Sequence, residues 1–178
     1  MEIPPVAIGA IGAALITSAM TFISLVHNKE QKTSEFRQAW IDALRNELSD
    51  VIAHLNAIQG AVEANYSSSQ DRWKVVREDY IGINRATAKI RLRLNSNEDA
   101  SKNILAIIEN LEILFAPGNR VDYRDLNDRE KKLVTGSQVL LKQEWDRVKK
   151  GELTYRVAKN SAFIVFVCSI LALGAMYL

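Results

Sequence analysis

The sequence predicts an all-α protein in which two transmembrane helices flank a cytoplasmic antiparallel bundle of about four helices. The first observation behind this prediction is that residues 3–26 and 161–178 contain no charged side chain. The second is that all 23 Lys and Arg, and 20 of the 21 Asp and Glu, lie between Lys29 and Lys159. The third is that apolar residues in this charged middle region recur every three or four positions, which is the period of an amphipathic helix.

Both uncharged ends are long enough to cross a bilayer. A helix that crosses about 30 Å of hydrocarbon needs roughly 20 apolar residues, and residues 3–26 satisfy this. Residues 161–178 reach about 27 Å, or more if the helix begins near Val157 and Lys159 snorkels to the interface. A buried core helix is the alternative for each end. A cleaved signal peptide fits the first end poorly, because "MEIPP" lacks Lys and Arg and "LVHNK" offers no small-residue cleavage site.

The basic residues predict how the two spans are oriented. They flank the inner end of each span and are absent from both tails, and the side richer in Lys and Arg is normally cytoplasmic. We therefore expect both termini to be periplasmic and residues 27–160 to be cytoplasmic. Tyr155 and Tyr177 fall where interfacial aromatic residues are expected. The flanking basic residues are Lys29, Lys32, Arg37 and Arg45 after the first span, and Lys142, Arg147, Lys149, Lys150, Arg156 and Lys159 before the second.

Four helices are predicted in the middle region. The first continues the first span, and "NYSSSQD" separates it from the second. "NSNED" then supplies a turn and an N-cap for the third helix, with acidic residues in its first turn. Pro117-Gly118 stops the third helix, and Gly151 ends the fourth. The four helices cover approximately residues 33–62, 73–94, 104–114 and 125–150.

The three tryptophans lie on the apolar stripes of separate predicted helices. Trp40, Trp73 and Trp145 each occupy a position in the three-and-four spacing of its helix. The helices would pack these stripes together as an antiparallel bundle. We therefore expect each indole to be largely buried.

No catalytic or metal-binding pattern is predicted. His27 and His54 lie far apart in the sequence, with no HExxH motif and no second soft ligand nearby. Cys168 is the one cysteine, and its place in the second span leaves it without a disulfide partner or a catalytic histidine. The middle region carries a net charge of 23 − 20 = +3, which is too small for a polyanion-binding tail. We expect a protein that is not an enzyme and binds no cofactor and no metal.

One face of the first span is lined by small and hydroxylated residues. They are Ala10, Ala14, Thr17, Thr21 and Ser24, at spacings of four, three, four and three. Close helix packing, with each hydroxyl bonded to its own backbone, explains such a stripe. The other interpretation is the weakly polar lining of an oligomeric pore. Two spans cannot enclose a water-filled path, so a pore would need several copies of the chain, and a homo-oligomer in the lipid bilayer is expected.

One face of the second middle-region helix is basic. Arg85, Lys89 and Arg93 recur every four residues and therefore share a face. A solvated face paired with neighbouring acidic residues accounts for this pattern. The alternative is a surface for an acidic partner or a nucleic-acid backbone.

Two segments resemble motifs of a known group of proteins. "SEFRQAWIDALRNELSDVIA" and "KIRLRLNSNED" resemble paired motifs in small bacterial membrane proteins that combine a membrane helix with a helical cytoplasmic domain. In size and two-span layout the chain is similar to the transmembrane effectors of retron antiphage systems. The resemblance implies an inner-membrane effector that damages the membrane on infection and is held inactive by a reverse transcriptase with its RNA–DNA product. A passive membrane-anchored scaffold or sensor is the alternative, because these motifs are structural and not catalytic.

Overall fold

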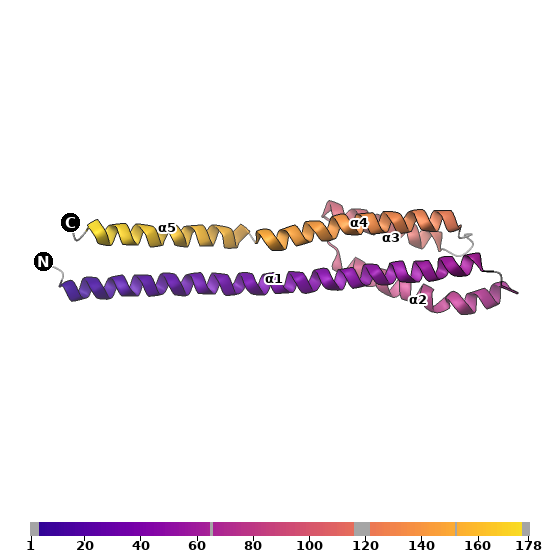
Figure 1. Ribbon diagram of the computed structural model, residues 1–178, viewed down its shortest axis with the longest axis horizontal. Coiled ribbons are helices and arrows are strands. Elements are labelled where there is room, and N and C mark those ends of the chain that lie inside the picture. Colours follow the sequence, from indigo (N-terminus) through magenta and orange to yellow (C-terminus); the bar gives the residue numbers. More distant parts are fainter. Residues whose placement is uncertain (1–3, 65, 116–121, 152, 176–178) are drawn as a thin grey trace. The chain divides into compact units, whose positions relative to one another are not determined.

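The protein is helical throughout its regular structure. The computed structural model describes residues 4–64, 66–115, 122–151 and 153–175, and within them the only regular elements are helices, which confirms the predicted all-α class. Figure 1 shows them in chain order: α1 (Pro5–Glu63), α2 (Ser69–Arg93), α3 (Asp99–Leu114), α4 (Tyr123–Lys150) and α5 (Leu153–Ala175).

The helix positions agree with the sequence predictions. α1 is one continuous helix of 59 residues that includes both the first apolar segment and the amphipathic segment after it. α3 ends at Leu114, whereas the predicted stop at Pro117-Gly118 lies outside the described residues. α5 begins at Leu153, well before residue 161, so the second apolar helix includes Lys159 near its first turns.

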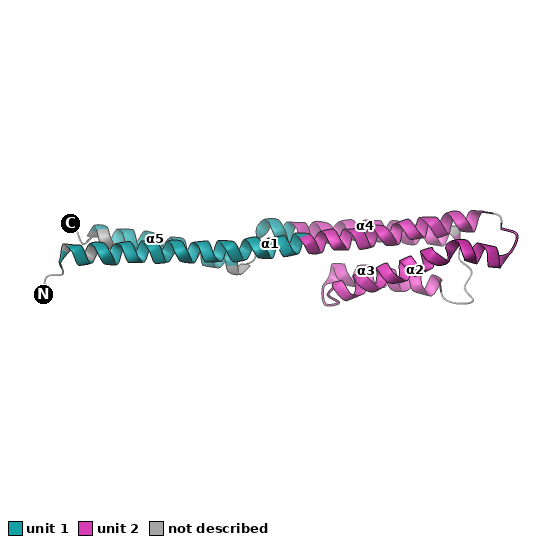
Figure 2. Ribbon diagram, turned by 90° about the horizontal axis from the view of Figure 1, so that it is seen from below, with its two compact units in different colours: residues 1–38, 146–178 teal, residues 39–145 magenta. Residues whose placement is uncertain are grey.

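The chain divides into two compact units, coloured separately in Figure 2. Unit 1 contains residues 1–38 and 146–178, and unit 2 contains residues 39–145. Unit 1 therefore holds the first part of α1 together with α5, and unit 2 holds the rest of α1 with α2, α3 and most of α4.

Unit 2 is built round one buried apolar cluster to which four helical segments contribute. Along α1 the buried face runs from Leu44 to Ala61 at spacings of three and four residues, as the apolar period predicted, and α2, α3 and α4 each add residues to the cluster. Burying these side chains stabilises the unit by roughly 25 cal/mol for each Å² of apolar surface removed from water. The fully buried large side chains of the cluster are Leu44, Val51, Leu55, Ile58, Ile90, Ile104, Ile108, Leu111, Leu126, Leu133 and Leu140.

A serine cap begins α2. The Ser68 hydroxyl accepts a hydrogen bond from the backbone N–H of Asp71 at 3.1 Å and donates one to the Asp71 carboxylate at 2.8 Å. This contact satisfies one of the N–H groups that a helix start leaves unpaired. Hydrogen bonds from Ser68 and from Lys74 hold the pKa of Asp71 below its usual value.

The two other predicted helix boundaries follow local turn chemistry. In "NSNED" the Asn95 side chain accepts a hydrogen bond from the backbone N–H of Asn97 at 3.0 Å, which forms the turn. Glu98 occupies the N-cap position of α3 without a side-chain capping bond, and Asp99 lies in the first turn. Gly151 ends α4 with a φ of 70°, a left-handed conformation that glycine adopts without strain.

The prediction that all three tryptophans are largely buried is wrong for two of them. Trp73 is 51% exposed and Trp145 is 44% exposed, whereas Trp40 is partly buried against the unit 2 cluster. Trp73 lies in the first turns of α2, where its ring packs on Tyr80 with the centroids 5.4 Å apart. Trp145 is the last residue of unit 2. Both lie at ends of the unit, where the helices that cover the middle of a stripe no longer surround it.

His54 fills a close contact between α1 and α2. Its Nδ1 lies 2.9 Å from Asp79 Oδ1, and the imidazole packs directly against Gly82. A methyl group on residue 82 would collide with the ring, so the two helices approach closely at a point where α2 has no side chain. The imidazole of His54 is therefore half-buried at a contact between two helices.

Replacing Gly82 with Ala should destabilise unit 2, because the new methyl group displaces His54 from Asp79. Overpacking of this kind costs about 1–3 kcal/mol, less the roughly 1 kcal/mol that Ala gains over Gly in a helix. The measurement is thermal unfolding of the full-length chain in detergent, followed by circular dichroism.

Gly60→Ala is the matched control, because a methyl group there meets nothing within 4 Å. It should leave the midpoint unchanged or raise it. In a His54→Ala background Gly82→Ala should no longer be harmful, and a loss of stability that persists there would contradict the proposed collision.

Candidate membrane-embedded site

Two helices of the protein are long and apolar enough to cross a membrane. Each of the stretches Gly9–Glu63 and Arg124–Leu171 contains an 18-residue apolar segment, and only 6% of each segment is buried within the described chain. A core helix of a water-soluble domain would instead have most of its apolar surface covered. The exposed large apolar residues of the two segments include Ile11, Leu15, Ile16, Met20, Phe22, Ile23 and Leu25 on α1, and Phe163, Ile164, Val165, Val167, Ile170 and Leu171 on α5.

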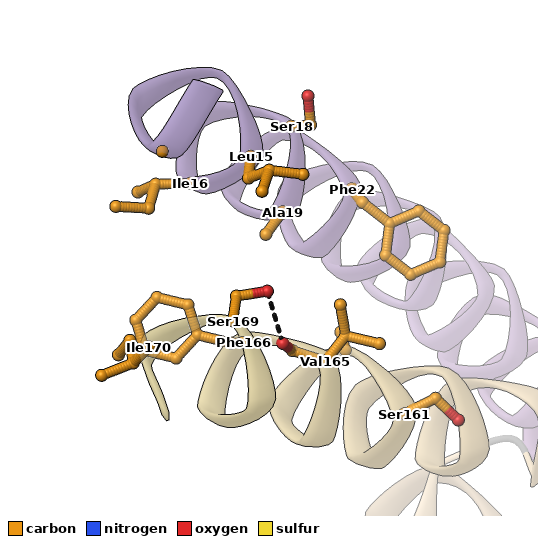
Figure 3. A pocket seen from close by; sticks show the side chains of 12 residues that line it. Leu15, Ile16, Ser18, Ala19, Phe22, Ser161, Val165, Phe166, Ser169 and Ile170 are labelled. Atoms are coloured by element: carbon orange, nitrogen blue, oxygen red, sulfur yellow. Dashed lines mark hydrogen bonds between the residues drawn. The ribbon is translucent and has the colours of Figure 1, made fainter. Parts of the chain in front are cut away.

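Within unit 1 these two apolar segments run side by side in opposite directions. A cavity of about 400 Å³ lies between them, with Leu15 and Ala19 of α1 on one side and Val165 and Ser169 of α5 on the other (Figure 3). A second cavity of about 120 Å³ lies further along α1, where Val26 and its neighbours meet Ala158 and Ala162. Within unit 1 the two helices are therefore antiparallel.

The small-residue stripe lies on the face of α1 that points away from α5. Gly12, Ala19 and Val26, spaced seven residues apart, line the α5-facing side. Each stripe residue is two positions from one of these three, and two residues turn an α-helix by about 200°. The stripe residues, all exposed, are Ala10, Ala14, Thr17, Thr21 and Ser24.

Two hydroxyls of the stripe are bonded to the helix itself. Thr17 Oγ1 donates to the carbonyl of Ala13 at 2.9 Å, and Thr21 Oγ1 donates to the carbonyl of Thr17 at 2.9 Å. Such bonds satisfy a hydroxyl in a hydrocarbon environment without any partner helix. The stripe is therefore compatible with lipid contact and with close approach of another helix.

The polar end of the α1–α5 pair carries groups suited to a membrane boundary. His27 of α1 and Tyr155 and Lys159 of α5 line the second cavity together with apolar side chains. Beyond them Glu30 lies beside Gly151, where a methyl group would approach its carboxylate to 2.8 Å. The apolar segments of both helices therefore end at the same level, and the charged residues begin there on both.

The three basic residues predicted to share a face of α2 differ in their surroundings. Arg93 forms a two-pronged ion pair with Glu47 of α1, with Nε–Oε2 and Nη2–Oε1 distances of 2.9 and 2.8 Å. Arg85 and Lys89 are exposed and form no ion pair with any residue that the structure describes. Only these two cations of the predicted face are free to meet an acidic partner.

The Glu47–Arg93 pair is a structural contact that joins α1 to α2. The Glu47 side chain is 8% exposed and that of Arg93 is 26% exposed. The hydrogen bonds that Arg93 donates to Glu47 raise the pKa of Arg93 above its already high usual value, so the guanidinium stays charged. Arg91 is two residues from both Lys89 and Arg93 and therefore lies on a different face of α2. It pairs with Glu112 at 2.6 Å, and both side chains of that pair are exposed.

The described residues contain no group of three or more His, Cys, Asp or Glu that could hold a metal ion. His27 and His54 lie in different units, and Cys168 is an exposed free cysteine on α5.

The sequence pattern did not reveal which face of the first span contacts the second. Gly12, Ala19 and Val26 follow a seven-residue spacing, but apolar and small residues surround this part of α1 on every side. An amphipathic period cannot be read where all faces are apolar. The sequence shows the stripe because its residues are small or hydroxylated. The face that contacts α5 is known only from the position of α5 in the structure.

Comparisons with known protein families, curated protein sequences and solved structures find no match to this chain.

Replacing Arg93 with Ala should destabilise unit 2 much more than replacing Arg91 with Ala. Loss of Arg93 leaves the buried Glu47 carboxylate without its cation, which costs about 3 kcal/mol. The exposed Arg91–Glu112 pair contributes about 0–1 kcal/mol. Thermal unfolding of the two full-length variants measures the difference. Equal losses of stability in the two variants would mean that the Glu47–Arg93 pair contributes no more to unit 2 than the exposed Arg91–Glu112 pair.

Proposed function

We propose that the protein is a two-span inner-membrane effector of a bacterial antiphage system, which perturbs or depolarises the membrane on infection and so causes abortive infection. α1 and α5 would cross the bilayer as a pair with both termini periplasmic. Residues 27–160 would form a cytoplasmic antiparallel bundle of about four helices. The proposed partner that holds the effector inactive is a reverse transcriptase with its RNA–DNA product, as in the retron systems that the chain resembles.

The observation that supports the membrane placement is the exposed apolar surface of α1 and α5. Water contact with large side chains such as Phe22, Phe163 and Leu171 is unfavourable by roughly 1.5–3 kcal/mol for each side chain that could be buried instead. Only 6% of either apolar segment is buried within the described chain. A bilayer would cover the rest, and α-helices satisfy all their backbone hydrogen bonds without water.

The apolar segments of α1 and α5 end at the same level, which also supports the membrane placement. His27 and Lys159 approach each other at one end of the antiparallel α1–α5 pair, and the Lys and Arg residues of the chain all lie beyond this level or at it. A pair of helices that crosses a bilayer together needs matched apolar lengths, because a mismatch must be relieved by tilting or by thinning the bilayer.

A homo-oligomer is the form in which such a pair could permeabilise a membrane. α5 covers only one face of α1, and the opposite face carries the Ala10–Ala14–Thr17–Thr21–Ser24 stripe. Small residues let helix backbones approach closely in lipid, where no hydrophobic force drives association. Several copies of α1 joined or lined by this stripe would form the perturbing assembly.

A membrane-anchored scaffold or sensor is the second candidate function. It is favoured by the hydrogen bonds that Thr17 and Thr21 make to their own helix, because they leave no polar group of these two residues in need of water. Under this alternative the stripe would pack without opening a path for ions.

The proposed topology predicts that a reporter fused after Leu178 is periplasmic. A reporter inserted near Ser68, in the connection between α1 and α2, should be cytoplasmic, because the Lys and Arg of both flanks favour that side. Alkaline phosphatase and a cytoplasmic fluorescent protein, compared at both sites, measure the two locations. A cytoplasmic position after Leu178 would rule out a second span.

The effector proposal predicts that Ala14→Leu or Thr17→Leu abolishes toxicity while membrane insertion is retained, because a bulky side chain keeps neighbouring helices apart. Growth and membrane potential after induction are measured with a potential-sensitive dye, in the presence and absence of phage. Ala14→Gly is the matched control, since it preserves close approach at the same position and should leave toxicity intact. Leu15→Ile, on the α5-facing side, should also be tolerated.

Two outcomes would contradict this proposal. If both Leu variants depolarise cells as fully as the parent, the stripe is not the working surface. If the parent never depolarises cells, even with phage present, the scaffold or sensor function replaces the effector function.

A further inference from the structure

The two cavities between α1 and α5 adjoin each other and form one groove, here named the membrane groove. Both are lined by Phe22 and Ala162, so the larger apolar cavity leads into the smaller one at the polar boundary. The larger cavity, at about 400 Å³, is within the size range of small-ligand sites. Its lining includes the small residues Ala19 of α1, labelled in Figure 3, and Ala162 of α5, which leave space between the helices.

The larger cavity of the membrane groove is mainly apolar, and its polar side chains are the serines Ser18, Ser161 and Ser169. Its walls are mostly aliphatic and aromatic, with Leu15 and Phe22 from α1 and Val165 and Phe166 from α5. The hydroxyl of Ser169, which lines the groove, already donates to the carbonyl of Val165 at 2.8 Å. A hydrocarbon chain fits such a surface, because it loses no hydrogen bond on entering it.

The other end of the membrane groove is cationic. Lys159 lines it beside His27 and Tyr155, and Lys159 forms no ion pair with any residue that the structure describes. The acidic Glu30 lies further along α1, next to Gly151, and lines neither cavity. A phosphate group placed at this end would meet an ammonium group and a phenol without facing a carboxylate of the groove wall.

We propose that the membrane groove binds one anionic glycerophospholipid of the surrounding bilayer. An acyl chain lies between Ala19 and Val165, and the phosphate lies against Lys159. This proposal rests on the membrane placement of α1 and α5 given above, and it adds a bound ligand to that placement. The cytoplasmic leaflet is the source of the lipid, because it is rich in anionic headgroups and basic pockets between helices at that level select them.

The chemistry of the groove favours this occupant over another helix. The polar end of the groove has a volume of about 120 Å³. This space is too small for a helix, which is about 10–12 Å across with its side chains. A single acyl chain with a charged head matches both the small volume of the polar end and the change from apolar walls to a cation. The stripe on the opposite face of α1 remains available for helix contacts.

Native mass spectrometry of the purified full-length chain in detergent tests the proposal. The chain is titrated with dioleoylphosphatidylglycerol or with dioleoylphosphatidylcholine, which share their acyl chains, and the Kd of the first bound lipid is measured. One well-placed lysine at a membrane surface contributes enough for about a fivefold preference. We expect phosphatidylglycerol to bind about fivefold more tightly than phosphatidylcholine to the parent.

Two pairs of matched variants identify the site. Lys159→Gln should abolish the preference for the anionic lipid, whereas Lys29→Gln, at the same boundary but outside the groove, should preserve it. Ala19→Leu should weaken the binding of both lipids by filling the groove, whereas Ala13→Leu, outside the groove on the same helix, should not. Resistance of each variant to alkaline carbonate extraction from membranes reports whether it still inserts.

Each outcome supports or overturns the proposal. Equal Kd values for the two lipids in the parent, equal effects of Lys159→Gln and Lys29→Gln, or unchanged binding in Ala19→Leu would each overturn it. If these results come from a chain that resists carbonate extraction, the lipid site fails and the membrane placement stands. If the parent itself is extracted by carbonate, the membrane placement fails and the lipid site fails with it.

Discussion

The constraint on which the rest of the structure depends is the uncovered apolar surface of α1 and α5. Two helices side by side can bury only the faces that meet, and each apolar segment keeps most of its side chains exposed. Only a hydrocarbon environment removes this surface from water without further protein. The Lys and Arg residues begin only where the apolar segments end, which fits the proposed membrane placement because these side chains are costly within hydrocarbon.

Unit 2 is stabilised in a different way, by a core of its own. Its buried side chains come from four helical segments and form one cluster, as in a water-soluble domain. Two polar contacts fix how α2 lies on α1 within this unit. The Glu47–Arg93 ion pair and the His54–Asp79 contact are both partly shielded from water, and the second requires glycine at position 82.

Within unit 1, α1 has two faces with different surroundings. The face that carries Ala19 lines the membrane groove with α5, and the face that carries Thr17 is directed about 200° away from it. A lipid bound in the groove would therefore leave the stripe available for another copy of the chain. Under the two proposals the small residues act differently on the two faces: on one they make room for a lipid, and on the other they permit close approach of another copy.

The sequence by itself determined the helical class, the continuous α1, the end of α4 and most of the buried stripe. These features depend on local physics: an apolar period and a glycine with positive φ at position 151. The tertiary structure decided what local patterns cannot encode. Trp73 and Trp145 match the stripe period yet are exposed, because burial depends on whether a neighbouring helix extends that far. Likewise the sequence does not distinguish Arg93 from Arg85 and Lys89, because only the tertiary structure places Glu47 of α1 beside Arg93. The membrane groove also depends on the tertiary structure, because it forms on the face of α1 that α5 contacts.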